Sequence, residues 1–247
     1  MPDPLAPFRA DPAGSAILLD IDGTLAPTVA HPADSSVPGE TLETITRLVG
    51  RFGLVGCVSG RTVEEARSLV PVGGLAFSGN HGLELLVDGV VCPVPDAVTY
   101  AGAISTAADR LRAVVAGAGG WIEDKGLTLT LHYRQSPDIP AAAALIGAEA
   151  RRIADGLGLR CVDARMSFEI RPPTDATKGT AVRSLLATAD VSRSLYAGDD
   201  TTDIDAFAAV DVAIAVDSAE APPGLRSGAT FAVDGPHGLL ELLNGLL

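Results

Sequence analysis

Short apolar segments alternate with amphipathic segments near both ends of the chain. Residues 16–19 and 54–58 are uncharged apolar runs bounded by turn residues, which is typical of strands buried on both faces of a sheet. Between them, Leu42, Ile45 and Leu48 share one face of a predicted helix. The same alternation predicts a strand at 75–77, a helix at 178–189, a strand at 195–197, a helix at 203–210, and strands at 212–216 and 230–233. Strands that alternate with helices predict a doubly wound parallel α/β sheet.

The pattern changes in the middle of the chain. Two Ala-rich helices, at 100–116 and 141–156, are interspersed with short strand-like segments that are joined by turns. This order predicts a small α+β insert with an antiparallel sheet. We therefore expect a core domain made from both ends of the chain and an inserted domain, with bounds at residues 1–97 and 173–247 for the core and 98–172 for the insert.

Composition and charge exclude several classes of protein. A net charge of −13 argues against nucleic acid as a partner. No apolar segment approaches the roughly 20 residues needed to span a bilayer, and the N-terminus lacks the features of a signal peptide. The three cysteines are far apart and have no metal-ligand spacing, so we expect them to be reduced. The expectation is a cytoplasmic protein without a membrane or nucleic-acid partner, and a monomer by default.

Two acids follow the first predicted strand. Asp20 and Asp22 lie where ligands bind in an open α/β sheet, just beyond the carboxyl end of a strand. Carboxylates this close repel each other unless a cation or a shared proton separates them, and Mg²⁺ prefers oxygen ligands and often accompanies phosphate. The alternative is an acidic turn, because Asp-Gly is common turn chemistry. Since the net charge would repel an anion, any phosphate site must be locally positive.

A second acidic cluster favours the metal interpretation. Asp199, Asp200, Asp203 and Asp205 lie in a segment that again follows a predicted strand and begins a predicted helix. A preference of helix N-termini for acids explains Asp203 and Asp205 but leaves Asp199 and Asp200 unexplained. One metal bound by both clusters would relieve the repulsion, and Asp199 is the candidate ligand.

Two further residues are suited to phosphate. Lys178 lies in the first turn of a predicted helix, where the helix dipole disfavours a cation, so an anion is its expected partner. Ser59, at the end of its strand, can donate a hydroxyl and an N–H to a phosphate oxygen, although alone it is unremarkable. The helix after it begins at Thr62, with Glu65 at capping-box spacing.

In chain order, Asp20-Ile21-Asp22-Gly23-Thr24, Ser59, Lys178 and Gly198-Asp199-Asp200 with Asp203 resemble the four motifs of the haloacid dehalogenase (HAD) superfamily. The resemblance implies a HAD-type Rossmann-like core, and the second acid, at position 22, is typical of the phosphatases in this superfamily. It implies that Asp20 is the nucleophile and forms an aspartyl-phosphate, while Asp22 protonates the leaving oxygen and then deprotonates water. It further implies that Ser59 and Lys178 hold the phosphoryl oxygens, and that the candidate Mg²⁺ ligands are Asp20, Asp22 through its carbonyl, Asp199, Asp200 and Asp203.

A closer resemblance covers almost the whole chain. Six motifs are similar to those of the trehalose-6-phosphate phosphatases: Ser59-Gly60-Arg61, Gly79-Asn80-His81-Gly82-Leu83-Glu84, Glu123-Asp124-Lys125, His132-Tyr133-Arg134, Glu169-Ile170-Arg171-Pro172 and Gly198-Asp199-Asp200-Thr201-Thr202-Asp203. The chain departs from the family pattern at Ile204, where an acid is expected. The resemblance implies that the insert is a C2-type cap that closes over a disaccharide phosphate, and that the protein releases phosphate from trehalose 6-phosphate with Mg²⁺ in trehalose biosynthesis.

Candidate substrate-binding residues follow from the same resemblance. They are Arg61, Asn80, His81, Glu84, Lys125, His132, Arg134 and Glu169. In the insert, polar and apolar residues alternate along 127–134 and 166–171, which gives each strand one polar face. The pattern alone favours an ordinary solvated face, and the resemblance favours sugar contacts instead. We expect Trp121 and Phe168 in the core.

Two other functions compete with this hypothesis. The chain could be another HAD sugar phosphatase, acting on a sucrose phosphate or a glycosyl phosphoglycerate with different cap contacts. It could also be a non-catalytic sugar-phosphate sensor, but a sensor has no use for an acid/base group at position 22. Turnover by an Asp22→Asn variant separates an enzyme from a sensor.

Overall fold

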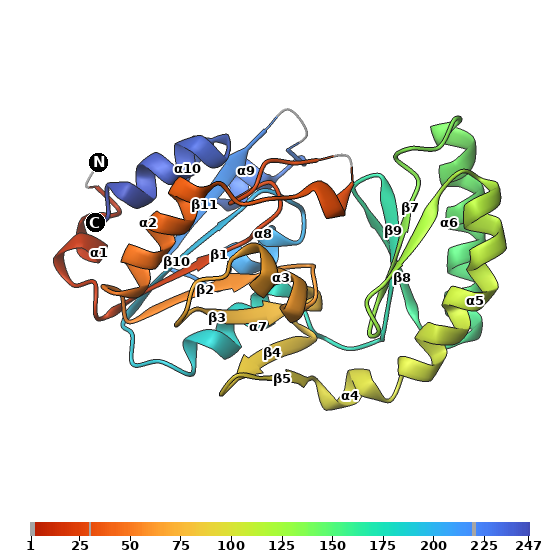
Figure 1. Ribbon diagram of the computed structural model, residues 1–247, viewed down its shortest axis with the longest axis horizontal. Helices are drawn as coiled ribbons and strands as arrows, with labels where there is room; N and C mark the ends of the chain where they lie inside the picture. Colours follow the sequence, from red (N-terminus) through yellow and green to blue (C-terminus); the bar gives the residue numbers. More distant parts are fainter. Residues whose placement is uncertain (1–2, 30, 219–220) are drawn as a thin grey trace. The chain divides into compact units, whose positions relative to one another are not determined.

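The computed structural model describes residues 3–29, 31–218 and 221–247 and forms two compact units. One unit combines Met1–Cys92 with Ala176–Leu247, and the other is Pro93–Asp175 (Figure 1). The assignment of the first unit as a hydrolase core and of the second as a substrate cap stays a prediction. Among the described residues, no helix is both long enough and apolar enough to cross a membrane.

The first unit is built on an eight-stranded sheet in which six neighbouring strands are parallel. This parallel-dominated α/β sheet was predicted from the sequence. In spatial order the strands are β12 (Phe231–Asp234), β11 (Val212–Asp217), β10 (Arg193–Gly198), β1 (Ser15–Leu19), β2 (Leu54–Val58), β3 (Ala76–Gly79), β4 (Glu84–Val87) and β5 (Val90–Pro93).

Helices cover both faces of this sheet because its central strands are apolar on both sides. On β1, Ile17 and Leu19 pack into one cluster with Ile45 of α2, while Leu18 packs into another with Val182 of α7. The first face carries α2 (Gly39–Val49), α3 (Val63–Leu69) and α10 (Gly235–Asn244), and the second carries α7 (Lys178–Leu186), α8 (Asp203–Phe207) and α9 (Leu225–Gly228). Shorter elements are α1 (Ala6–Ala10), η1 (Pro32–Asp34) and η2 (Asn80–Gly82).

A hairpin at one edge makes the sheet mixed and was not predicted. Strand β4 runs antiparallel to β3, and β5 continues the sheet beyond it (Figure 1). The two strands are joined through Asp88 and Gly89, which have φ of 50° and 79°. Asp-Gly between apolar residues is a strong hairpin signal, since this turn requires positive φ at both central residues.

The second unit is an antiparallel sheet with two long helices on one face (Figure 1). Leu129, Leu131 and Ile170 point into a core shared with Ile104 and Ile146 of these helices. The strands, in spatial order, are β6 (Trp121–Asp124), β7 (Leu129–His132), β9 (Ser167–Arg171) and β8 (Arg160–Ala164), and the helices are α5 (Ala101–Gly117) and α6 (Ile139–Gly156), preceded by α4 (Pro95–Val98).

The two aromatic residues that were expected in this core have different positions. Phe168 is buried in it, as predicted. Trp121 lies outside it, because it is the cross-strand partner of His132 and stacks on that ring with a centroid separation of 4.1 Å. The prediction was wrong for Trp121. This residue is the first of its strand, so no preceding strand residue gives an alternating pattern that would show which face of the sheet it lies on.

Candidate active site

Asp20 lies at the carboxyl end of β1 and is only 4% exposed. Its main-chain N–H donates to the carbonyl of Ala197 on the neighbouring β10, which extends the strand pairing by one residue. Lys178, at the start of α7, lies 2.9 Å from Asp20 Oδ1 through its Nζ and is itself 3% exposed. The structure therefore joins the two predicted catalytic residues in one buried ion pair.

Asp203 completes this buried cluster from the first turn of α8. Its Oδ1 accepts hydrogen bonds from Lys178 Nζ at 2.7 Å and from the hydroxyl of Tyr196 at 2.6 Å. Its Oδ2 accepts from the main-chain N–H groups of Asp199 and Asp200, at 3.1 and 2.9 Å. With four donors, Asp203 holds both the lysine and the turn that carries Asp199.

The three carboxylates shift the pKa values of the groups around them. Burial raises the pKa of Asp20 well above its usual value; Lys178 lowers it, and Asp203 and Asp199 raise it. Burial lowers the pKa of Lys178, but Asp20 and Asp203 outweigh burial, so the ammonium stays charged. Burial and the same carboxylates also raise the pKa of Tyr196. Three acids share one lysine, and the remaining negative charge favours a cation.

Oxygen atoms of Asp20, Asp199 and Asp203 lie within 4.8 Å of one another, and all three side chains are buried. Carboxylate oxygens suit a hard cation such as Mg²⁺. Gly23 is required beside them, because it has a φ of 82° and a Cβ there would lie 2.1 Å from Asp199 Oδ2. The geometry fits a divalent metal at Asp20 and Asp199. Asp200 is outside this group and accepts a hydrogen bond from the N–H of Thr201.

Asp22 has a different environment from Asp20. Its side chain is 42% exposed and is held by Arg61, whose Nε and Nη2 donate to Oδ2 and Oδ1 at 2.6 and 2.8 Å. Ser35 also donates to Oδ1, at 2.9 Å. The carboxylate is thus held at the margin of the buried cluster, where a proton can be exchanged with solvent.

Ser59 lies at the end of β2 and is 1% exposed. Its N–H donates to the carbonyl of Ser78 on β3, and its hydroxyl accepts from the N–H of Arg61 at 3.2 Å. The capping box predicted for the next helix is confirmed, with Thr62 and Glu65 bonded reciprocally. These contacts fix the strand end that carries Ser59.

The candidates between 80 and 84 form a buried network. Asn80 Nδ2 donates to Glu84 Oε1 at 2.8 Å, and the N–H of Val63 donates to Glu84 Oε2 at 2.9 Å. The imidazole of His81 lies beside Gly60, where a Cβ would be 2.5 Å from the ring. The network links this segment to the loop that follows Ser59.

In the second unit, polar candidates line the sheet face opposite the helices. The carboxylate of Glu123 lies 2.8 Å from His132 Nε2 and 3.8 Å from Lys125 Nζ. Glu169, which pairs with Thr130 across the strands, lies 3.7 Å from Arg171 Nε. Arg134 occupies the turn after β7. His132 and Glu169 thus share a face with Glu123, which was quoted as a motif residue but not singled out.

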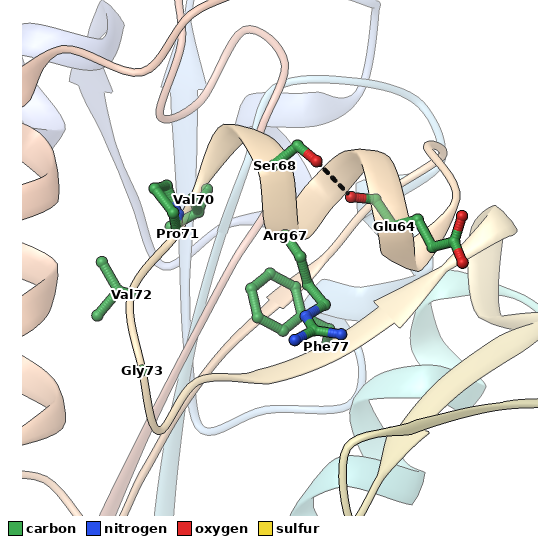
Figure 2. Close-up of a pocket in the computed structure, with 8 residues that line it drawn as sticks. All are labelled: Glu64, Arg67, Ser68, Val70, Pro71, Val72, Gly73 and Phe77. Atoms are coloured by element: carbon green, nitrogen blue, oxygen red, sulfur yellow. Dashed lines mark hydrogen bonds between the residues drawn. The ribbon is translucent and has the colours of Figure 1, made fainter.

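A pocket of about 480 Å³ elsewhere in the first unit contains none of the predicted site residues. It is formed by the outer side of α3, the loop after it and the start of β3 (Figure 2). Its lining residues are Glu64, Arg67, Ser68, Val70, Pro71, Val72, Gly73 and Phe77. The buried acidic cluster, rather than this pocket, therefore marks the candidate active site.

The fold and this arrangement of acids define a HAD-type protein. A solved structure described as a trehalose-6-phosphate phosphatase related protein has a TM-score of 0.80 and 26% identity, and the match covers 94% of this chain and 96% of that one. The trehalose-phosphatase family model matches residues 18–222. The chain belongs to the trehalose-phosphatase family, as its motifs predicted.

Two relatives illustrate how this chain compares with longer proteins. A trehalose-phosphate phosphatase of Mycolicibacterium paratuberculosis is 34% identical over 79% of this chain and 51% of its own length. A protein of Mycobacterium tuberculosis named an uncharacterized glycosyl hydrolase is 33% identical over 94% of this chain, which corresponds to 18% of its length. The chain thus spans about half or less of the length of these relatives.

Proposed function

We propose that this chain hydrolyses trehalose 6-phosphate to trehalose and phosphate, with Mg²⁺ as its cofactor and a phosphoryl group carried on Asp20. The observation that carries the proposal is the buried Asp20 carboxylate, which lies 2.9 Å from Lys178 and within 4.8 Å of Asp199. Family membership supports the choice of substrate.

In the first step, a carboxylate oxygen of Asp20 forms a bond to phosphorus, and the bond from phosphorus to the sugar oxygen breaks. Asp22 gives its proton to that oxygen, so the sugar leaves as an alcohol. Its exposed position suits this role, because the buried Asp20 is surrounded by other charges. The Ser59 hydroxyl and the Lys178 ammonium bind the phosphoryl oxygens.

In the second step, water attacks phosphorus and gives a proton to Asp22. The bond from phosphorus to Asp20 breaks, phosphate leaves, and both carboxylates return to their starting states. Asp20, Asp199 and the main-chain carbonyl of Asp22 would hold Mg²⁺, which neutralises negative charge on the phosphoryl group when bound. Asp203 holds Lys178 and the turn that carries Asp199 in place, since its oxygens already accept four hydrogen bonds.

The polar face of the second unit is the proposed sugar site. Glu123, Lys125, His132 and Glu169 supply carboxylate, ammonium and imidazole groups on one sheet face. Sugar hydroxyls both donate and accept, so a mixed set of this kind suits them.

The test compares phosphate release from trehalose 6-phosphate, sucrose 6-phosphate, glucose 6-phosphate and a glucosyl phosphoglycerate, with Mg²⁺ and with EDTA. We expect the highest kcat/KM for trehalose 6-phosphate, and activity only with the metal. Preference for another substrate would overturn the substrate assignment but would leave the proposed phosphatase mechanism in place. No turnover of any of them, with binding intact and unchanged in Asp22→Asn, would identify a sensor instead.

A further inference from the structure

We propose that Arg61 is a positioning residue that fixes the Asp22 carboxylate, and that the buried Asn80–Glu84 pair holds the loop from which Arg61 acts. The inference rests on the proposed function, because it assigns these residues to the proton-transfer group. It differs from the expectation drawn from the family resemblance, in which Arg61, Asn80 and Glu84 contact the substrate.

Two of the three guanidinium nitrogens of Arg61 donate hydrogen bonds within the protein. Nε and Nη2 bind the two oxygens of Asp22 in a bidentate pair, and Nη2 also donates to the carbonyl of Pro32 at 2.9 Å. The Arg61 side chain is 11% exposed. A bidentate guanidinium fixes both the position and the plane of a carboxylate. Arg61, together with Ser35, therefore determines where the Asp22 carboxylate lies when it accepts a proton.

The main chain at Arg61 is held by the segment after β3. The carbonyl of Arg61 accepts from the N–H of Asn80 at 2.6 Å, and the carbonyl of Ser59 accepts from the N–H of His81 at 3.0 Å. The two segments approach so closely that a Cβ on Gly79 would lie 2.8 Å from the Arg61 carbonyl oxygen. The loop carrying Arg61 is thus held by this neighbouring segment in addition to its own contacts at Ser59 and Thr62.

That neighbouring segment is itself strained. Asn80 and His81 have φ of 50° and 54°, a left-handed conformation that non-glycine residues rarely adopt twice in succession. Such strain persists where surrounding contacts over-determine the conformation. The contacts are those of Glu84, which accepts from the Asn80 side chain and from the N–H of Val63 at the start of α3. Asn80 is fully buried and Glu84 is 8% exposed, so this bridge is shielded from water.

The consequence is a chain of contacts from Glu84 through Asn80 and the Arg61 backbone to Asp22. The cluster of Asp20, Lys178 and Asp203 is held by contacts among these residues and with Tyr196. We therefore expect the loss of a link to act first on the acid/base group. The effect should therefore be on proton transfer, which contributes on the order of 10²- to 10⁴-fold to such reactions.

The test measures kcat and KM for trehalose 6-phosphate in Arg61→Gln, Arg61→Lys and Glu84→Gln. We expect kcat to fall about 10²-fold in Arg61→Gln and less in Arg61→Lys and Glu84→Gln, with KM within about twofold of the parent. Arg67→Gln is the matched control, because Arg67 is exposed on α3 and lines the separate pocket of Figure 2. A raised KM with unchanged kcat would overturn the proposal in favour of substrate contact.

A double-mutant cycle with Asp22→Asn distinguishes positioning from a general structural role. If Arg61 acts through Asp22, adding Arg61→Gln to Asp22→Asn causes no further loss of kcat. Losses that multiply would overturn the proposal. If Asp22→Asn alone keeps full turnover, the proposed function fails; if it loses turnover while Arg61→Gln does not, only this inference fails. Should Glu84→Gln not fold, the Arg61 variants still decide the outcome.

Discussion

Asp20 and Asp22 are two residues apart, yet the protein holds them by opposite means. Asp20 is buried with Lys178 and Asp203, and the ion pairs among these three residues are shielded from water. Asp22 is partly exposed and is held by Arg61. The comparison suits the proposed roles: a buried, charged and fixed environment for Asp20 as nucleophile, and a fixed direction with access to solvent for Asp22 as proton donor.

The largest expected effect is on turnover, and it assigns Asp20 and Asp22 to different steps of the proposed reaction. Asp20→Asn should lower turnover by about 10⁴-fold or more for a sugar phosphate and for p-nitrophenyl phosphate, because no covalent intermediate forms. Asp22→Asn should keep a stoichiometric burst of p-nitrophenol, since that leaving group departs without a proton. Rapid-mixing absorbance measures the burst, with exposed Asp190→Asn as the control. A burst in Asp20→Asn would contradict the assignment.

The next effect concerns stability and sharpens the contrast in burial. Lys178→Met leaves the buried carboxylates of Asp20 and Asp203 without their cation, and we expect a loss of about 3–5 kcal/mol in the free energy of unfolding. Urea denaturation measures it, and Arg183→Met, an exposed change on the same helix, is the control. A loss equal to that of the control would show that the ion pair contributes little.

Metal binding should depend on pH in a defined direction. Because the pKa of Asp20 is raised, the folded protein without metal binds this proton more tightly than the unfolded chain does. Its stability therefore falls as the pH rises from about 4 through the raised pKa, and Mg²⁺, which requires the ionised carboxylate, restores it. At about 100 times its Kd, Mg²⁺ should add about 2.7 kcal/mol. The difference between the melting temperatures in Mg²⁺ and in EDTA should be larger at pH 8 than at pH 5. In Asp199→Asn, Mg²⁺ and EDTA should give the same melting temperature.

The smallest expected effect is on stability, for the partly exposed pair of Arg61 and Asp22. Arg61→Gln should lower the free energy of unfolding by only about 0–1 kcal/mol, because a partly exposed ion pair is screened by water and salt. The same variant is expected to lose most of its turnover, so its activity would fall while its free energy of unfolding changes little. Urea denaturation beside the kinetic assay checks this, and a loss as large as that of Lys178→Met would remove the contrast.

The sequence predicted the positions of the acids well for a physical reason. Asp20 and Asp199 follow β1 and β10, which are adjacent parallel strands, so their carboxyl ends meet at one sheet edge. Each strand ends in an uncharged run, residues 16–19 in β1 and 195–198 in β10, and the next residue is an acid. These features are local, and a local pattern is what a sequence displays most directly.

The partners of these acids were harder to predict because they come from distant loops. The contact between Arg61 and Asp22 depends on how two loops meet, and the one between Glu84 and Val63 depends on two left-handed residues. Tyr196 was indistinguishable from a core residue, since only the position of Asp203 gives its hydroxyl a partner. Such contacts are set by tertiary packing and carry no periodic signal.

The position of β1 in the sheet also determines when this part of the protein can fold during synthesis. One of its two neighbours is β10, so that Ile17 pairs with Leu195. During translation the apolar strand β1 therefore lacks one of its two neighbouring strands until β10 has been synthesised. A product that stops before codon 203 lacks Asp203, the acceptor for Lys178, so we expect it to fold poorly and to lose the proposed activity.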